Sequence, residues 1–329
     1  MPVFSKPAAN REWGHPLAGE PEVSVLMSVH NGGKFLPSAT GSILRQTLRN
    51  LEMIVVDDGS TDGTWQYLDR LRADDARVRA TRLEAQSGQG GALNVALGLA
   101  RAPWVAILDA DDVSLENRIE RQLAFVGQHP GLKGSGCLAY YIDDRGRRLG
   151  KSTHDLVTED DYRRYIRESR TIGFWHSGAF LERATVERLG GYRARFDPAH
   201  DCDLLNRIAD AGVVLIQPEH LIEYRVHPKS LTATRSAEMR LKYEWVRACT
   251  LARRGGRREP ALSEFLAAWG AAGCCARVSR WRKAKAKRLY RQAGLEYAYG
   301  MPIRAGAHLV ASAVLQPSYA IRVFLKQRL

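Results

Sequence analysis

The stretch Trp104-Val-Ala-Ile-Leu-Asp109-Ala110-Asp111-Asp112 decides the fold prediction. Its first five residues are apolar, which is typical of a buried parallel strand, and its last four include three carboxylates. The carboxyl end of such a strand opens onto the crevice where α/β proteins bind ligands. Three clustered acids repel one another unless a cation or a cationic side chain lies among them. The stretch therefore predicts a strand that ends at a site for a metal ion and a phosphate group.

A second interpretation of the same acids is a solvated turn. Asp112 and Ser114 could both cap a helix that begins near Leu115. Mg²⁺ and Mn²⁺ prefer oxygen ligands, and Mg²⁺ usually takes one or two carboxylates together with substrate phosphates. These residues alone leave both interpretations open.

Strand-like and helix-like segments alternate along the first 130 residues. Strands are expected at 23–29, 51–56, 78–83 and 105–108, and helices at 35–47, 63–72, 91–101 and 115–129. This rhythm predicts a mostly parallel sheet covered by helices. After Gly131 the rhythm weakens, with strands expected at 133–142, 213–217 and 222–226 and helices at 160–167 and 200–211.

A second strand also ends in acids, in Val55-Val56-Asp57-Asp58-Gly59-Ser60-Thr61-Asp62. A carboxylate there could accept hydrogen bonds from a nucleobase. The alternative is a turn in which Ser60 or Asp62 caps the next helix. Two acidic strand ends in one parallel sheet point to the same edge, which favours a shared binding site.

Three glycines open the helix expected after the third strand, in Gly88-Gln89-Gly90-Gly91-Ala92-Leu93-Asn94. Such a loop lets backbone N–H groups approach phosphates at a helix N-terminus, although a simple flexible loop fits equally well. It is no dinucleotide fingerprint, which should follow the first strand. There the chain has His30-Asn31-Gly32-Gly33 instead.

The third group of candidate residues lies further along the chain, in His176-Ser177-Gly178-Ala179 and Ala199-His200-Asp201-Cys202-Asp203-Leu204. Asp201 begins a helix, where it is either a cap or a general base. Asp203 is expected to be a first-turn acid only. His227 follows a short strand and is either a metal ligand, a phosphate donor or a structural histidine.

These motifs, taken in order, resemble the family 2 glycosyltransferases. The resemblance rests on residues 23–31, 55–62 and 108–112 and covers roughly residues 21–230. It implies an α/β fold: a single Rossmann-like A-type glycosyltransferase domain with a mostly parallel central sheet, followed by a basic helical C-terminal extension. It also implies a nucleoside-diphosphate sugar as donor.

The resemblance further implies roles for individual residues. Asp201 would be the catalytic base of an inverting transfer. Asp111 and His227 would contact a Mn²⁺ or Mg²⁺ ion. Ser28 and Asp58 would hold the nucleobase and ribose, and the nucleotide sugar would be bound by polar loop residues and their neighbours: Ser28, His30, Asn31, Asp58, Asn94, Asp109, Ala110 and Asp111.

The chain departs from the family pattern in a few places. The family often has Glu-Asp where this chain has His200-Asp201, and frequently Trp where it has Leu205. The Gln-x-x-Arg-Trp motif of processive synthases is absent, which implies transfer of one sugar at a time. The resemblance and the basic C-terminal region favour a role in cell-surface polysaccharide, lipopolysaccharide or glycolipid assembly. The alternatives are a sugar-nucleotide pyrophosphorylase and a non-catalytic nucleotide-sugar-binding module.

Charge divides the chain unevenly. Residues 1–239 carry 30 Lys/Arg against 32 Asp/Glu, whereas residues 240–329 carry 19 against 4, a balance of +15. We expect a loose leader at 1–21 and a catalytic domain at 22–235. Within that domain, 22–130 is the expected nucleotide-sugar-binding half and 131–235 the acceptor-binding half. The basic helical region is expected at 236–329.

The basic region has its own hypothesis. Eight Lys or Arg residues lie within fifteen positions (277–291), and Ile321, Phe324 and Leu325 have amphipathic spacing. This pattern favours peripheral contact with an anionic membrane, although a solvated face or packing on the main domain would also fit. No nucleic-acid motif accompanies the charge, so no nucleic-acid partner is expected.

The cysteines and the apolar segments indicate the cellular compartment. Five cysteines without Cys-x-x-Cys spacing argue against a disulfide framework or a zinc site. Neither a signal-peptide pattern nor an apolar run of the ~18 residues needed to span a bilayer is present. We therefore expect a cytoplasmic protein at the inner face of the cell membrane.

Overall fold

The computed structural model describes residues 19–227, 230, 235–271, 273–298 and 301–318. The chain forms two compact units, Met1–Glu259 and Pro260–Leu329. Each unit is described here by itself.

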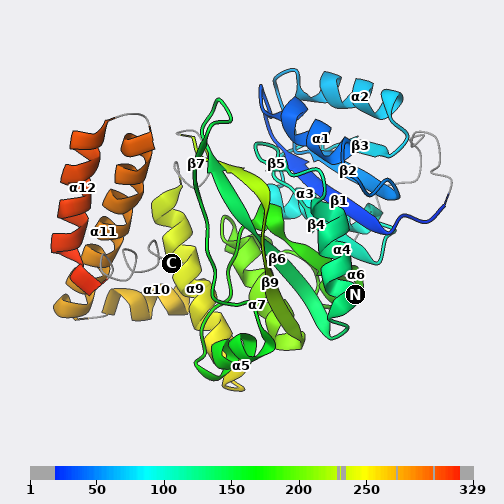
Figure 1. The fold of residues 1–329 in the computed structure, drawn as a ribbon. Coiled ribbons are helices and arrows are strands. Elements are labelled where there is room, and N and C mark those ends of the chain that lie inside the picture. The colour runs from blue at the N-terminus through cyan, green and yellow to red at the C-terminus, as the bar shows by residue number, and fades with distance from the viewer. Residues whose placement is uncertain (1–18, 228–229, 231–234, 272, 299–300, 319–329) are drawn as a thin grey trace. The chain divides into compact units, whose positions relative to one another are not determined.

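A nine-stranded sheet forms the centre of the first unit (Figure 1). The strand order is β3-β2-β1-β4-β8-β6-β9-β5, with β7 beside β6. The strands are β1 (Val23–Val29), β2 (Leu51–Asp57), β3 (Val78–Arg82), β4 (Trp104–Ile107), β5 (Val113–Ser114), β6 (Leu132–Ile142), β7 (Arg148–Lys151), β8 (Phe180–Glu182) and β9 (Val213–Arg225).

The first four strands run parallel, as the alternating rhythm predicted. The register sets Val29 beside Asp57 and Leu26 beside Ile107. The chain leaves β1, β2 and β4 at one edge of the sheet, so the acidic segments after β2 and β4 flank the end of β1. This arrangement confirms the predicted α/β fold and brings two of the three motif groups together.

The other half of the sheet is mixed. β8 runs antiparallel between β4 and β6, and β9 pairs parallel with β6. The two short strands expected at 213–217 and 222–226 are one strand, β9, whose pairing with β6 shifts register near Leu138. The shift lets a single strand continue past Pro218.

Helices cover both faces of the sheet. They are α1 (Leu36–Leu44), α2 (Thr64–Asp74), α3 (Gln89–Leu99), α4 (Arg118–Gln128), α5 (Glu159–Arg167), α6 (Arg183–Arg188), α7 (His200–Ala211) and α9 (Ser236–Arg254). Short 3₁₀ turns lie at His176–Gly178 and Ala194–Phe196. Side chains of β1 alternate between two buried clusters, Leu26 joining one and Met27 the other.

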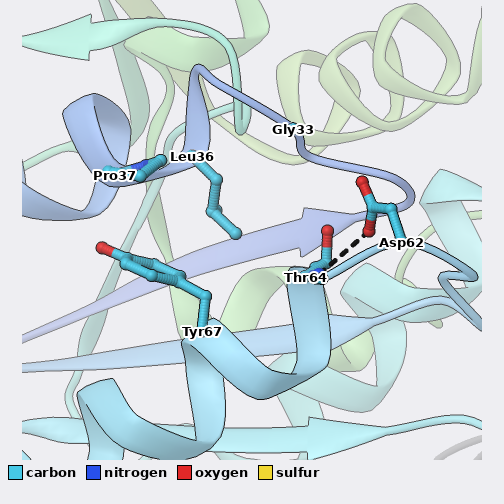
Figure 2. A pocket seen from close by; sticks show the side chains of 7 residues that line it. Gly33, Leu36, Pro37, Asp62, Thr64 and Tyr67 are labelled. Carbon is cyan, nitrogen blue, oxygen red and sulfur yellow. Dashed lines mark hydrogen bonds between the residues drawn. The ribbon is translucent and has the colours of Figure 1, made fainter.

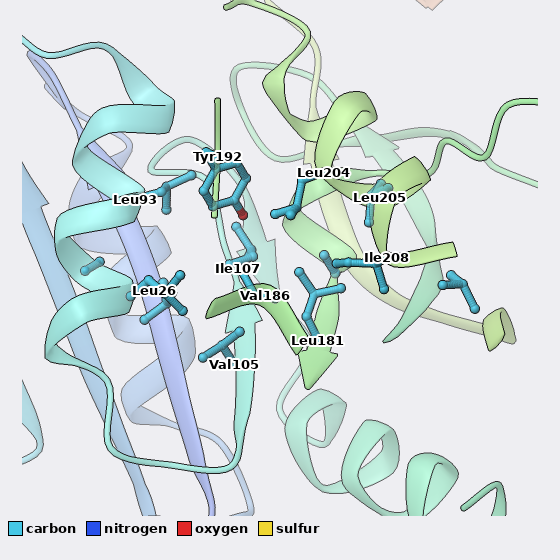
Figure 3. Close-up of a cluster of buried hydrophobic side chains, with 14 of the residues drawn as sticks. Leu26, Leu93, Val105, Ile107, Leu181, Val186, Tyr192, Leu204, Leu205 and Ile208 are labelled. Carbon is cyan, nitrogen blue, oxygen red and sulfur yellow. The ribbon is translucent and has the colours of Figure 1, made fainter. Parts of the chain in front are cut away.

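One of these clusters packs α3 and α7 on the same face of the sheet. Figure 3 shows Leu93 of α3 and Leu204 of α7 on either side of Ile107 and Tyr192. Burying apolar surface between these elements is the main force that holds them together. The two helices that begin beside the acidic strand ends are thus fixed by a common core.

The first unit extends to Glu259, past residue 235 where the sequence placed the end of the catalytic domain. Helix α9 packs on α7, and Asp210 near the end of α7 pairs with Arg253 and Arg254 at distances of 2.6 and 2.7 Å. These contacts tie α9 to the sheet domain.

The second unit consists of α10 (Leu262–Ala271), α11 (Cys274–Ala298) and α12 (Pro302–Leu315). Small side chains let α11 and α12 pack closely: Ala286, Ala293, Ala305 and Ser312 are buried, and Ser312 Oγ donates to the Ala286 carbonyl at 2.8 Å. Among the helices described, none is long and apolar enough to cross a membrane. Ile321, Phe324 and Leu325 lie outside the described residues.

Candidate active site

The carboxylate of Asp58, directly after β2, is almost completely buried. Its Oδ1 accepts hydrogen bonds from the Ser87 backbone N–H at 2.6 Å and the Ser87 hydroxyl at 2.9 Å. Its Oδ2 accepts one from the Gly88 N–H at 2.9 Å. Gly88 has a φ of +79°, which a glycine adopts without strain. Asp58 therefore fixes the glycine-rich loop at the start of α3.

The segment after β1 lies against the loop after β2. The ring of His30 contacts the Asp58 carbonyl oxygen through Nδ1 at 2.9 Å, and the Asn31 backbone N–H donates to Ser60 Oγ at 2.9 Å. Ser28 is half-buried on β1 opposite Val56. The structure thus brings together Ser28, His30, Asn31 and Asp58, which the sequence placed in one donor site.

The glycine-rich loop also reaches the acids after β4. Gln89 Nε2 donates to Asp109 Oδ1 at 2.7 Å. The Asp109 N–H donates to Ser177 Oγ at 3.1 Å. Gly88 hydrogen bonds to Asp58, and the next residue, Gln89, hydrogen bonds to Asp109. This short segment therefore connects the two acidic strand ends. Gln89 was not among the sequence-predicted site residues.

Asp111 and Asp112 have different surroundings. Asp111 is about one-third exposed, and its Oδ2 lies 3.0 Å from His227 Nε2. Asp112 is buried and accepts hydrogen bonds from the Ser177 hydroxyl and from the Arg225 N–H. Burial and the charges of Asp111 and Asp109 raise the pKa of Asp112 well above its usual range. Ala110 is half-buried in the turn between the acids.

The capping interpretation of the triplet is wrong. Helix α4 begins at Arg118 with Asn117 in the cap position, well after Asp112. The carboxylate of Asp112 instead ties the β4 loop to Ser177 and to the end of β9. Its role is to hold the loop that presents Asp109 and Asp111.

His176 lies next to Asp109, and Tyr192 contacts His176. His176 Nδ1 lies 3.7 Å from Asp109 Oδ1, and His176 Nε2 lies 2.9 Å from the Tyr192 hydroxyl. Burial opposes ionisation of both His176 and Asp109. Their attraction outweighs it, so the pKa of His176 is raised and that of Asp109 is lowered. The sequence marked the His176 segment without a role and missed Tyr192.

The amide of Asn94 is engaged with the same tyrosine. Its Nδ2 donates to the Tyr192 carbonyl and its Oδ1 accepts from the Tyr192 N–H, both at 2.8 Å. This two-point contact fixes α3 to the segment that leads into α7. Contact between Asn94 and a nucleotide sugar stays a prediction. In the structure, the Asn94 side chain hydrogen bonds to the Tyr192 backbone.

The start of α7 is less well paired. Within the described part of the chain, the ring nitrogens of His200 and Oδ1 of Asp201 are buried without hydrogen-bond partners. Asp203, expected to be only a first-turn acid, is buried and pairs with Arg193 and with Arg207. Asp203 therefore anchors the helix, whereas Oδ1 of Asp201 has no hydrogen-bond partner among the described residues.

Asp111 and His227 are the residues that could hold a metal ion. A carboxylate and an imidazole are both suitable for Mn²⁺, and Mg²⁺ also accepts a single carboxylate when substrate phosphates supply further oxygens. The partly exposed Asp111 oxygen that now contacts His227 is free to take such a ligand position. Among the described residues, no three His, Cys, Asp or Glu side chains are grouped so that they could hold a metal ion.

A separate pocket of about 190 Å³ lies beside the loop after β1. Figure 2 shows Leu36 and Pro37 of α1 facing Thr64 and Tyr67 of α2 across it. No sequence-predicted site residue lines this pocket. The candidate donor site lies elsewhere, at the ends of β2 and β4, which Asp58, Asp109 and Asp111 follow.

A parallel half-sheet with acidic loops after β2 and β4, joined to a mixed half, is an A-type glycosyltransferase fold. The family model for glycosyl transferase family 2 matches residues 24–190. The chain belongs to glycosyltransferase family 2, as the resemblance implied. The matched region ends before Asp201 and His227.

Individual relatives agree with this family. The chain is 39% identical over 98 residues to the glycosyltransferase GlyG of Streptococcus pneumoniae, covering 30% of this chain and 33% of GlyG. It is 33% identical over 104 residues to WfaP of Escherichia coli, a UDP-Glc:α-D-GlcNAc-diphosphoundecaprenol β-1,3-glucosyltransferase, covering 32% of this chain and 41% of WfaP. These matches span less than half of either relative.

A solved structure shares the fold. The mannosyltransferase PcManGT from Pyrobaculum calidifontis, in complex with GDP-Man and Mn²⁺, matches with a TM-score of 0.55. It is 22% identical, with 92% of this chain and 90% of that chain covered. At this identity the likeness concerns the fold alone.

Proposed function

We propose that this protein transfers a single sugar from a nucleoside-diphosphate sugar to an acceptor hydroxyl, with inversion at the anomeric carbon. The observation that carries the proposal is the loop Ser87–Gln89, which hydrogen bonds to Asp58 and Asp109 together. That loop sets two acids from different strands around one helix N-terminus. WfaP, named for a UDP-Glc donor, and PcManGT, bound to GDP-Man, support a donor of this class.

The donor would lie along the ends of β1, β2 and β4. Ser28 and Asp58 would hold the nucleoside, with His30 and Asn31 closing the same side. The glycine-rich start of α3 offers backbone N–H groups and a favourable dipole to phosphate oxygens. Asp109, held by Gln89 and His176, would face the sugar.

Asp111 and His227 would hold the Mn²⁺ or Mg²⁺ ion. When bound, the ion supplies positive charge that offsets the charge developing on the leaving diphosphate. The two side chains already lie 3.0 Å apart, so the protein brings these candidate ligands together before any donor enters.

Asp201 would be the general base. It would take the proton from the acceptor hydroxyl as that oxygen attacks the anomeric carbon from the side opposite the diphosphate. Because the fold leaves Asp201 Oδ1 unpaired, the carboxylate has an acceptor position for that proton. A single displacement of this kind inverts the configuration, and general-base assistance contributes roughly 10²–10⁴-fold.

A donor panel tests this proposal. The full chain is incubated with UDP-glucose, UDP-N-acetylglucosamine or GDP-mannose, with and without Mn²⁺, and release of nucleoside diphosphate is measured. We expect Mn²⁺-dependent release from at least one donor, and loss of that dependence in Asp111→Ala. Pyrophosphate exchange instead of nucleoside-diphosphate release would contradict the proposal and favour a pyrophosphorylase.

We also propose that the second unit contacts an anionic membrane during polysaccharide or glycolipid assembly. Ile303, Val310 and Val314 of α12 are 88%, 65% and 70% exposed. Their spacing places them on one face of the helix, opposite Ala305 and Ser312, which are buried.

Six exposed basic residues lie on α11: Arg277, Arg282, Lys283, Lys285, Lys287 and Arg288. Apolar insertion and attraction to anionic headgroups would act together, and the diphosphoundecaprenol acceptor named for WfaP suits such a location.

Vesicle flotation tests the membrane proposal. We expect the full chain to float with vesicles containing phosphatidylglycerol but not with phosphatidylcholine alone, and Val310→Asp to reduce flotation. A matched control is Ala305→Ser, a change within the buried contact between α11 and α12. Equal flotation of wild type and Val310→Asp would remove α12 from the membrane contact.

A further inference from the structure

The side chain of His200 is almost completely buried, yet its hydrogen-bonding capacity is unused. It is 2% exposed. Among the described residues, neither Nδ1 nor Nε2 has a hydrogen-bond partner. Nδ1 lies 3.4 Å from Asp197 Oδ1, near enough for charge attraction but without hydrogen-bond geometry. A buried polar group left unpaired lowers stability, and such groups in native proteins call for an explanation.

The neighbouring histidine, His176, differs in that one of its nitrogens is hydrogen bonded within the protein. His176 has Tyr192 on one nitrogen and Asp109 near the other. The rings of His176, His200 and Tyr192 meet edge to face in all three pairs, with centroids 5.5–5.8 Å apart. The two histidines therefore pack on the same tyrosine ring, but only His176 is hydrogen bonded to the tyrosine hydroxyl.

The position of His200 links it to the donor side of the site. A Cβ added to Gly90, in the first turn of α3, would lie 3.3 Å from the His200 ring. The residue before Gly90 is Gln89, which holds Asp109. The residue after His200 is Asp201, whose Oδ1 is also unpaired. His200 thus lies between the turn that holds the donor-side acid and the proposed base.

We infer that His200 is a specificity-determining residue that hydrogen bonds to a hydroxyl of the transferred sugar, directly or through one ordered water. A neutral imidazole both donates and accepts a hydrogen bond, which matches a hydroxyl group, whereas a carboxylate at this position could only accept. One of the two unused nitrogens then gains a hydrogen-bond partner when the donor binds. This inference rests on the proposed function, because it requires a nucleotide-sugar donor.

The main test compares His200→Leu with His176→Leu. The first change removes two unpaired nitrogens, so we expect a melting temperature equal to or above that of wild type. The second removes the nitrogen that is hydrogen bonded to the Tyr192 hydroxyl, so we expect a lower melting temperature. A purely structural His200 would instead destabilise the protein when replaced, and that result would overturn the inference.

Calorimetry supplies the ligand readout. UDP, UDP-glucose and UDP-N-acetylglucosamine, and GDP and GDP-mannose, are titrated with Mn²⁺ present. For wild type we expect at least one nucleotide sugar to bind more tightly than its nucleoside diphosphate. In His200→Leu that advantage should fall about five- to tenfold, the loss of one hydrogen bond, while nucleoside-diphosphate affinity stays unchanged.

The variant His200→Gln keeps the test decisive if His200→Leu does not fold. Glutamine also donates and accepts, so we expect it to keep part of the sugar advantage. An undiminished sugar advantage in both variants would overturn the inference and leave the proposed function intact. A wild type that binds no member of the panel would overturn both.

Discussion

The two sides of the site treat their carboxylates in opposite ways. On the donor side, Asp58 accepts three hydrogen bonds and Asp109 is held by Gln89 and attracted by His176. At the start of α7, Asp201 Oδ1 and both nitrogens of His200 are buried without partners in the described structure. The donor-side carboxylates are hydrogen bonded within the protein, whereas these three atoms at the start of α7 are not.

The difference shows where the fold uses polar groups for its own stability. A paired carboxylate stabilises the loops that surround it, so replacing it should weaken the fold. An unpaired one contributes nothing to the folded state and costs free energy, a pattern typical of residues retained for function. Substitutions on the two sides should therefore separate stability from activity.

The largest effect is expected from Asp201→Asn. We expect turnover to fall by roughly 10²–10⁴-fold, because the amide no longer accepts a proton. The melting temperature should not fall, since Oδ1 has no partner to lose. Steady-state kinetics and thermal unfolding measure both. The contrast is Asp203→Asn, which should lower the melting temperature because Asp203 pairs with Arg193 and Arg207. Near-normal turnover of Asp201→Asn would end the assignment of the base.

A change at Asp58 should affect stability and binding together. In Asp58→Asn an amide nitrogen faces the backbone N–H of Ser87 or of Gly88, so one hydrogen bond is lost and a donor opposes a donor. We expect a loss of about 1–3 kcal/mol in the free energy of unfolding, with weaker donor binding because the loop is no longer fixed. Chemical denaturation and calorimetry measure these. Asp62→Asn, an exposed acid of the same loop region, serves as control, and equal stability of the two variants would refute the comparison.

A paired carboxylate should also show itself in acid, as at Glu52, the second residue of β2, which lies at the other end of that strand from Asp58. Burial raises the pKa of Glu52, but hydrogen bonds from Ser24 and Arg101 outweigh it, so the pKa lies below its usual value. The stabilisation is therefore present above the ordinary Glu pKa of about 4.3 and is lost as the pH falls through the lower folded value. We expect Glu52→Gln to cost on the order of 2 kcal/mol at pH 7, and the gap from wild type to narrow below about pH 4. A gap independent of pH would contradict this.

The smallest effect concerns the contact between the two sides. Tyr192→Phe removes the hydroxyl bonded to His176 Nε2 and keeps the ring. We expect a loss of about 1 kcal/mol in stability and a fall of a few-fold in turnover, because His176 loses one of the contacts that orient it beside Asp109. Thermal unfolding and kinetics of the purified variant measure these. Unchanged turnover at reduced stability would make the tyrosine structural only.

Much of this arrangement was predictable before any coordinates. Apolar runs of strand length predicted β1, β2 and β4, and the acids after them predicted a shared edge. Pairing was not predictable: Asp112 resembled a helix cap until it was seen to contact Ser177 and Arg225. Asn94 likewise has a bond to Tyr192, 98 residues away in sequence. Contacts of this range depend on how the second half of the sheet meets the first.

The succession of strands and helices along the first half of the chain, the acidic loops and the family were determined by local pattern, because periodicity and turn chemistry act over a few residues. Which acids hold the structure together and which stay unpaired was decided only in three dimensions. Asp201 and Asp203 are two residues apart on one helix, yet only Asp203 meets arginines. The physical reason is that the partners of a buried charge come from distant segments, and packing alone determines which segments meet.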